Sequence, residues 1–324
     1  MGIYLGANEL GGGGGSAGGG GYIPGIIGFE AFVLSGGGGG GFRATYGGGG
    51  AGGGTLAHLF AYATKDTTIP ITVGAGGTTQ VVGGSSIIGS GLLVTTIVGG
   101  GAGTYDTNLT DNFGTCPGGR GSRNSTTAVK RYGNGFNNKG KVLGVLNAAA
   151  VTVPFENIGK NINDTTTPRF NGQTLAYSGP GGAGLGGDGA TPPYNGGSIG
   201  GIGLDPTTIT DRFLTQAEYQ TEGIGEVTSS VAYIGGGGSG YRASGRANPP
   251  GGCGADDTAG ADDTAGLANT GGGGGARGSG GSGFIMLRLP TSQSVTTTGA
   301  PSTYIKGNDT VYVWKSTGSI ILNS

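Results

Sequence analysis

The sequence predicts an all-β protein in which glycine-rich segments of polyproline II type run beside β-strands in an elongated, sandwich-like body. Three observations lead to this fold class. Glycine provides 84 of the 324 residues and proline another 13, far above the share in an ordinary globular chain. The segments between the glycine runs are short and rich in β-branched residues, which is typical of strands. One segment alone, residues 211–220, has the pattern of a helix.

The low charge content argues against a disordered chain and narrows the classes of binding partner. Charged residues make up 11% of the chain, and the formal net charge is −1. Disordered chains are usually kept open by net charge, so we expect these glycine runs to be held in place. The neutral balance also argues against a general polyanion-binding protein. The chain does not open with a basic and apolar leader, and its longest apolar stretch, Ile87 to Val98, is interrupted by glycine and polar residues. We therefore expect neither a signal peptide nor a membrane span.

The first part of the chain divides into an N-terminal attachment segment, residues 1–10, and a glycine-rich region, residues 11–103. Within that region the segment 29–35 predicts a strand that is covered on both sides, because both of its faces carry apolar residues. Residues 55–77 predict a hairpin whose turn lies near 65–68 and whose second strand covers 69–73. A third pair of β-branched runs follows at 81–82 and 85–98. On the first strand, Phe29, Ala31, Val33 and Ser35 share one face, and Glu30, Phe32 and Leu34 share the other.

The composition changes at Thr104, where glycine thins out, and residues 104–177 are interpreted as a loop-rich insertion. Glycine returns in residues 178–290, which form the second part of the body and carry a further insertion at 204–233. That insertion contains the helix expected at 211–220, on which Phe213, Leu214 and Ala217 share one face. Residues 291–324 are expected to form a C-terminal β unit.

The glycine runs have the length and the freedom of polyproline II segments. Six residues such as Gly36 to Gly41 would span roughly 19 Å in that conformation. Such a segment has no internal hydrogen bonds, so neighbouring segments must satisfy its N–H and C=O groups. Ordering glycine costs at least about 1 to 2 kcal/mol per residue, and lateral hydrogen bonds between many segments are the source of stability that this composition offers. The alternative interpretation is a set of flexible linkers.

Four stretches together resemble a known family. They are the strand running into SGGGGGG at 29–41, GGGGAGGG at 47–54, IPITVGAGG at 69–77 and LANTGGGGGARGSGGSGFIMLRLP at 267–290. The combination resembles the glycine-rich domain of bacteriophage tail-fibre proteins, and the opening IYLGANEL resembles the start of fibre proteins. The resemblance implies a homotrimer in the virion that attaches to other tail or fibre proteins through Ile3, Tyr4 and Leu5.

The C-terminal unit departs from that family pattern. A unit such as residues 296–322 usually precedes the first glycine-rich strand, whereas here it ends the chain. We therefore expect the C-terminal strand to pair beside residues 29–34, in the same or a neighbouring protomer.

The motifs that suggest catalysis are weak. GFNNKGKV at 135–142 fits the phosphate-binding loop pattern but has Val142 where Ser or Thr must hold Mg²⁺. GGSIG places Ser198 in a nucleophile-elbow pattern, yet the only histidine, His58, lies in a strand-like run. The repeated ADDTAG supplies four aspartates, but it looks like a loop duplication. Cys116 and Cys253 allow two free thiols or one bridge. We expect no enzyme activity, no cofactor and no metal site.

The clearest candidate surface is basic and aromatic. Six basic residues fall between 120 and 141 with no acid among them. Three interpretations compete: a solvated loop, a contact for anionic surface polysaccharide or lipopolysaccharide phosphate, and RNA binding, of which the last fits the neutral chain least. Aromatic residues in the loops are able to stack on sugar rings. The receptor-facing candidates are Tyr105, Phe113, Arg120, Arg123, Lys130, Arg131, Tyr132, Phe136, Tyr194 and Tyr241.

These features favour a non-enzymatic virion protein, made in the host cytoplasm, that recognises a polysaccharide or outer-membrane protein on the bacterial surface. Nucleic acid and membrane insertion are not expected. The alternative is a purely structural virion component, such as a decoration or filament subunit, that recognises no receptor. Loops held by a stiff frame are where binding residues tend to lie, which favours the first interpretation. We expect the loops of residues 104–177 and 204–233 to meet the host surface.

Overall fold

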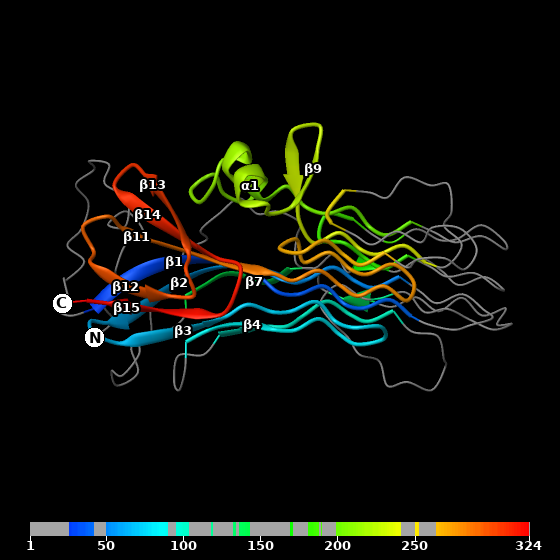
Figure 1. Cartoon of the computed structure of the whole chain (residues 1–324), viewed down its shortest axis with the longest axis horizontal. Helices are drawn as coiled ribbons and strands as arrows, with labels where there is room; N and C mark the ends of the chain where they lie inside the picture. The colour runs from blue at the N-terminus through cyan, green and yellow to red at the C-terminus, as the bar shows by residue number, and fades with distance from the viewer. Residues whose placement is uncertain are drawn as a thin grey trace, which may run out of the picture.

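The computed structural model describes residues 26–41, 50–89, 95–103, 118, 132–133, 136–142, 169–170, 181–187, 189, 199–240, 250–252 and 264–323. Within these ranges the protein is mostly β-strand with a single α-helix, which confirms the all-β class. Two sheets pack face to face at one end, and the glycine-rich segments run side by side away from them (Figure 1).

The larger sheet has six strands in the order β13-β14-β11-β1-β2-β7. All neighbours are antiparallel except β2 and β7, which are parallel. The strands are β1 (Ile26–Leu34), β2 (Leu56–Thr64), β7 (Phe136–Val142), β11 (Phe284–Pro290), β13 (Ser302–Lys306) and β14 (Asp309–Trp314).

The smaller sheet has five strands in the order β12-β15-β3-β4-β5. It comprises β3 (Thr68–Thr72), β4 (Ser86–Ile88), β5 (Thr95–Ile97), β12 (Val295–Thr298) and β15 (Gly318–Leu322). Two further pairs are β6 (Tyr132–Gly133) with β8 (Arg169–Phe170), and β9 (Glu226–Thr228) with β10 (Val231–Tyr233). The short helix η2 covers Pro206–Thr208, and α1 covers Gln216–Glu222.

Strand β1 is buried on both faces, as its sequence predicts. Phe29, Ala31 and Val33 face the core between the two sheets. Phe32 and Leu34 face a second core that the segment around α1 closes from the other side. The fold therefore has three layers, with the six-stranded sheet in the middle.

The predicted hairpin at residues 55–77 is wrong, although both strands and the turn exist. β2 belongs to the six-stranded sheet and β3 to the five-stranded sheet. The turn carries Asp66 at φ 60° and closes on Leu322, whose carbonyl accepts from the Asp66 N–H at 2.6 Å. The chain crosses between sheets here, so Ala63 of β2 and Ile69 of β3 fill one core from opposite sides. Of the third pair of β-branched runs, the run 85–98 contains both β4 and β5, whereas Val81 and Val82 lie outside the strands.

The helix is shorter than predicted and begins later. Thr215 caps α1, since its hydroxyl accepts from the Glu218 N–H while the Glu218 carboxylate accepts from the Thr215 N–H. This capping box fixes the start of the helix, so Phe213 and Leu214 are buried ahead of it rather than on it. Ala217, expected on the apolar face, is exposed.

The expected pairing of the C-terminal strand with residues 29–34 is also wrong. β1 lies between β2 and β11, so both of its edges are occupied. The last strand, β15, instead pairs with β12 and β3 in the other sheet. The C-terminal unit is thus divided between the two sheets, with β13 and β14 extending the larger one beyond β11.

The glycine segment 36–41 is hydrogen-bonded to six neighbours in a repeat of three residues. Gly36 and Gly39 donate to one neighbour and Gly37 and Gly40 to a second, whereas Gly38 donates to a third. The carbonyl groups of these residues accept hydrogen bonds from three other segments, and here too residues three apart share the same neighbouring segment. The N···O distances are 2.8–3.1 Å. The donors reach Gly84 and Val81, Gly281 and Gly278, and Gly52; the carbonyls of residues 36 to 41 accept from Gly100, Gly77, Gly274, Gly103, Gln80 and Arg277 in that order.

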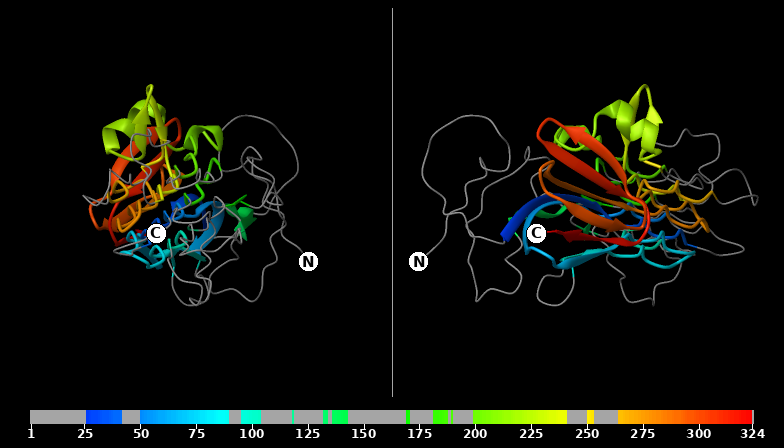
Figure 2. Two further views of the ribbon diagram at one scale, coloured as in Figure 1. Left: turned by 90° about the vertical axis from the view of Figure 1, so that its right-hand side faces the viewer. Right: turned by 60° about the vertical axis from the view of Figure 1, so that its left-hand side comes forward.

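This arrangement explains why these positions are glycine. A Cβ built on any residue from Gly36 to Gly40 would lie 1.8–2.2 Å from a backbone carbonyl oxygen of a neighbouring segment, closer than a real Cβ ever comes to such an atom. The segments continue the strands directly, since β1 runs into the segment 35–41 and the segment 278–283 runs into β11. The β-sandwich therefore holds one end of the glycine bundle, which Figure 2 also shows from its far end.

Candidate functional site

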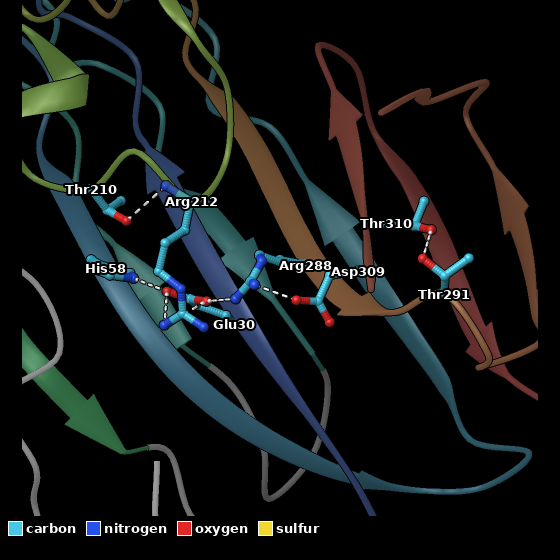
Figure 3. A network of polar contacts seen from close by, with 8 residues as sticks. All are labelled: Glu30, His58, Thr210, Arg212, Arg288, Thr291, Asp309 and Thr310. Carbon is cyan, nitrogen blue, oxygen red and sulfur yellow. Dashed lines mark hydrogen bonds and ion pairs between the residues drawn. The ribbon is translucent and has the colours of Figure 1, made fainter. Parts of the chain in front are cut away.

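A cluster of charged side chains lies buried on the six-stranded sheet, on the face that carries the second core (Figure 3). Its centre is Glu30 of β1. The His58 Nε2 atom lies 2.7 Å from Glu30 Oε1, and Arg288 donates from Nη1 to Glu30 Oε2 at 2.8 Å. Glu30 and His58 are each only 2% exposed.

Two further residues complete this Glu30 cluster. Arg288 also donates from Nη2 to Asp309, the first residue of β14. Arg212, which lies in the segment before α1, places Nη1 3.4 Å from the Glu30 carboxylate. Arg288 stands directly opposite Glu30 in the pairing of β1 with β11, so the sheet register brings the two charges together.

The surroundings set opposite pKa shifts on the two carboxyl groups. Burial by itself raises the pKa of Glu30. The hydrogen bond and charge of His58, the charge of Arg212 and the hydrogen bond from Arg288 outweigh it, so the pKa lies below its usual value. Burial raises the pKa of Asp309 above its usual value, against the charge of Arg288. The carboxylate of Glu30 is thus held ionised.

Aromatic rings close the cluster from the side of the second core. The rings of His58 and Phe213 meet edge to face with centroids 5.8 Å apart, and Phe32 lies 5.5 Å from Phe213. Both oxygens of Glu30 already accept hydrogen bonds. This geometry suits a buried structural cross-link that joins β1, β2, β11 and β14 to the segment before α1.

A second polar contact holds α1 against the edge of the same sheet. Glu222 accepts from the Ser302 hydroxyl at 3.0 Å and from the Tyr304 hydroxyl, and it pairs with Lys315 at 3.0 Å. Glu218 pairs with Lys306. Burial and the hydrogen bond to Glu222 raise the pKa of Tyr304 to about 12. The helix is therefore fixed to β13 by charge-assisted hydrogen bonds.

Most of the residues expected to face a receptor lie outside the described residues. The exceptions are Tyr132, which begins β6, and Phe136, which begins β7 opposite Leu56 of β2. The sequence that resembles a phosphate-binding loop is this strand β7. The candidates outside the described ranges are Tyr105, Phe113, Arg120, Arg123, Lys130, Arg131, Tyr194 and Tyr241, together with Ile3, Tyr4 and Leu5 of the attachment segment, Ser198, and the repeated ADDTAG except for the last three residues of its second copy, 264–266.

The described glycine segments do place the points from which several of these candidates depart. Gly103 donates to the Gly39 carbonyl near the end of the segment 36–41, and Tyr105 follows two residues later. Ser239 accepts from Ala276 at the same level of the bundle, and Tyr241 follows it by two residues. Both departure points therefore lie beside the end of the segment 36–41 that is farther from β1.

Comparison with known families agrees with the composition. The family model described as a glycine-rich domain matches residues 23–290. The chain belongs to the glycine-rich domain family. The match spans the bundle and all but the last strands of the sandwich. No curated protein and no solved structure is significantly similar to the chain.

Two negative findings apply to the described part of the chain. It contains no group of three or more His, Cys, Asp and Glu side chains placed to hold a metal ion. None of its helices is long and apolar enough to cross a membrane.

The sequence did not predict the Glu30 cluster. Its signal is the single carboxylate within an otherwise apolar strand and the single histidine of the chain in the next strand. A buried charge of this kind requires a partner, but Arg212 and Arg288 lie more than 180 residues away in sequence, and only the sheet order identifies them.

Proposed function

We propose that this protein is a non-enzymatic virion tail-fibre or receptor-binding protein that recognises the surface of a bacterial host. The observation that carries the proposal is the glycine bundle. Its central segment has six hydrogen-bonded neighbours, and the segments end together at the far end from the sandwich. A frame of this kind presents loops at one tip, and rigidly supported loops are a common location for binding sites.

The glycine segments of the proposed fibre are polyproline II helices. A polyproline II helix has three residues per turn and no internal hydrogen bonds. In the segment from Gly36 to Gly41, residues three apart form hydrogen bonds with the same neighbouring segment, and this three-residue repeat supports the conformation. A bundle of such helices resists bending, because each segment is tied to several others along its whole length.

The sequence assigns host contact to the loops of residues 104–177 and 204–233. The second of these packs over the six-stranded sheet, and β7 of the first pairs with β2 in the same sheet. The proposed binding surface is therefore made by the part of residues 104–177 outside β7.

The segment 104–117 begins directly after Gly103 and ends at Gly118, and a Cβ on Gly118 would lie 2.0 Å from the Ala102 carbonyl oxygen. Both ends of that loop therefore lie side by side at the far tip. The basic residues Arg120, Arg123, Lys130 and Arg131 suit the phosphate and carboxylate groups of bacterial surface polysaccharide. Lys139 and Lys141 lie in β7 beside β2 and are not part of this surface.

The proposed assembly is a homotrimer that attaches to other tail or fibre proteins through Ile3, Tyr4 and Leu5. The resemblance of the glycine-rich stretches to tail-fibre proteins supports both points, and the chain's membership of the glycine-rich domain family is consistent with them. The sandwich lies at the opposite end of the glycine bundle from the proposed receptor-binding tip.

Cell binding tests the proposal. The full chain, labelled at a surface lysine, is titrated onto a panel of bacterial strains beside two variants. One variant replaces Arg120, Arg123, Lys130 and Arg131 with glutamine, and the other removes residues 104–117 and joins Gly103 to Gly118 by a two-glycine linker. The matched control is Lys65→Gln, an exposed lysine in the turn between β2 and β3, at the sandwich end.

The proposal predicts saturable binding to at least one strain, unchanged in the Lys65→Gln protein and lost or reduced at least tenfold in one or both tip variants. Binding that survives in both tip variants would contradict the assignment of the tip. Ordered self-assembly with no binding to any strain would favour a purely structural virion component.

A further inference from the structure

Several glycine-rich segments continue directly from strands of the two sheets. Three strands run into segments and three segments run into strands: β1 into 35–41, β3 into 73–80, β5 into 98–103, and 50–55 into β2, 81–85 into β4, 278–283 into β11. Figure 1 shows these strands and segments extended along the same long axis. The sheets and the bundle are therefore built from the same continuous stretches of chain.

The central stretch of this kind is residues 26–41, which comprise β1 and the segment 35–41. Together they would span roughly 50 Å at the usual rise of an extended strand and of a polyproline II helix. β1 pairs with β2 over its whole length and with β11 over Glu30–Leu34. Every N–H from Ser35 to Gly40 donates to another segment, and every carbonyl from Gly36 to Gly41 accepts from one. The stretch is thus bound to neighbours from one end to the other.

The Glu30 cluster adds ionic contacts in the middle of β1. Glu30 contacts His58 of β2 at 2.7 Å and Arg288 of β11 at 2.8 Å. Glu30 is only 2% exposed, so salt and water screen these contacts little. Both contacts cross from β1 to a neighbouring strand, and they therefore oppose any sliding of β1 along β2 or β11.

Side chains at both ends of the glycine run 36–41 prevent it from sliding lengthwise. The Cβ of Ser35, moved one residue towards the far tip, would lie 1.9 Å from the Ala75 carbonyl oxygen. The Cβ of Phe42, the next residue in the sequence, moved two residues the other way, would lie 1.8 Å from the Gly275 carbonyl oxygen. Real Cβ atoms essentially never come within 3.0 Å of such atoms. The run is therefore held in register in both directions.

The direction of a pull decides how these contacts break. Hydrogen bonds between antiparallel strands lie perpendicular to the strands. A pull along the long axis therefore loads all the contacts of residues 26–41 at the same time, whereas a pull that separates two strands from one end breaks them one after another. Forced unfolding is governed by the unfolding barrier, which is highest when many contacts must break in one step.

We propose that this protein bears tension along its long axis and that residues 26–41 are the stretch that carries it. The two points at which the tension acts rest on the proposed function, in which the attachment segment precedes β1 and the receptor-binding loops lie at the far tip. The resistance to tension rests on the contacts of residues 26–41 alone. The buried Glu30 cluster then has a mechanical role, because its ionic contacts hold β1 in register under load.

Single-molecule force spectroscopy of the full chain tests the inference by pulling it in two directions. One handle is attached at the N-terminus, which leads into β1. With the second handle at Lys65, beside the end of β2 that pairs with the start of β1, the pull unzips β1 from β2. With the second handle at Val81, which is 48% exposed and accepts from Gly39 near the far tip, the pull runs along the long axis.

In the wild-type protein the lengthwise pull is expected to need roughly twofold or more the force of the unzipping pull, because its contacts must break together. Gly38→Ala is expected to lower the lengthwise force and to leave the unzipping force unchanged, since unzipping starts at the opposite end of β1. The matched control is Gly187→Ala, whose Cβ would meet first the Ile202 Cγ2 atom at 2.8 Å, and it is expected to behave like the wild type.

Equal forces in the two directions would overturn the inference without any variant, and so would a folded Gly38→Ala protein whose lengthwise force is unchanged. Cell binding by a protein that ruptures equally easily in both directions would leave receptor recognition standing. High lengthwise resistance without cell binding would leave the tension-bearing stretch standing and contradict the proposed function.

Discussion

Replacing Gly38 with alanine tests whether the glycine bundle is a hydrogen-bonded lattice. Gly38 lies in the middle of the segment 36–41. An alanine Cβ there would lie 2.2 Å from the Gly101 carbonyl oxygen and 2.6 Å from its carbon. Real Cβ atoms essentially never come within 3.0 Å of such atoms, so the two segments must separate by at least 0.8 Å, the difference between 3.0 and 2.2 Å.

That separation breaks the hydrogen bonds between the two segments. Gly100 donates to Gly36, and Gly103 donates to Gly39, both at 2.9 Å. Adding the required 0.8 Å lengthens each to about 3.7 Å, beyond hydrogen-bonding range. Two buried N–H groups without acceptors cost about 1 to 3 kcal/mol each, and the stiffer unfolded chain returns about 0.4 to 1 kcal/mol. We expect Gly38→Ala to lower the free energy of unfolding by about 3 kcal/mol.

Denaturant unfolding followed by circular dichroism measures this loss. The matched control is Gly187→Ala, whose Cβ would meet first the Ile202 Cγ2 atom at 2.8 Å and nothing else within 3.6 Å. The Ile202 side chain is 39% exposed and is free to turn away, so the control is expected to change stability by less than about 1 kcal/mol. A Gly38→Ala protein as stable as the Gly187→Ala protein would refute the lattice.

Four further predictions concern the sandwich and its helix. Glu30→Gln is expected to lower the free energy of unfolding by about 3 to 5 kcal/mol, because the buried guanidinium of Arg288 loses one of its two carboxylate partners. Glu218→Gln at the helix surface is expected to change it by less than about 1 kcal/mol. Equal losses in denaturant unfolding would count against the Glu30 cluster. Because the pKa of Glu30 lies below its usual 4.5 in the folded protein, its stabilising contribution is complete above pH 4.5 and disappears as the pH falls through the folded-state pKa, so Glu30→Gln should flatten the acid side of a stability profile measured by thermal unfolding. Gly223→Ala is expected to cost about 1 kcal/mol, since φ is 63° and no atom lies within 4 Å of the added Cβ; a neutral effect in thermal unfolding would exclude the left-handed cap. In an alkaline absorbance titration the hydroxyl of Tyr304 should ionise near pH 12, and Glu222→Gln should lower that pKa. An unchanged titration in the variant would contradict the hydrogen bond between Glu222 of α1 and Tyr304 of β13.

Much of the fold follows from local sequence patterns. The alternation in Phe29 to Leu34 identifies a strand buried on both sides, and the apolar run FIMLRLP at 284–290 identifies β11. The sequence also contains the capping box of Thr215 and Glu218, which marks a later start for the helix than the expected one at Asp211. Turn residues predicted the corner at 65–68 correctly.

The remaining features depend on contacts between distant segments. Nothing local in residues 55–77 distinguishes a hairpin from a crossing between two sheets; the difference is made by β15, which pairs with β3 from the far end of the chain. The partners of Glu30 and the position of the C-terminal strand also depend on segments far apart in the sequence, so local patterns do not predict them. The glycine runs predict close approach of backbones, but six neighbours for the segment 36–41 emerge only when all the runs are placed together.

Native-state hydrogen exchange of the glycine amides tests the account most directly. If the bundle is a lattice, the amides of Gly36 to Gly40 exchange only when the whole protein unfolds, with the same protection as Phe32 and Val33 in the centre of β1, because every one of these N–H groups has a partner in another segment. Exchange of the glycine amides at the rate of an unstructured chain, while β1 stays protected, would contradict the rigid frame and the function proposed from it.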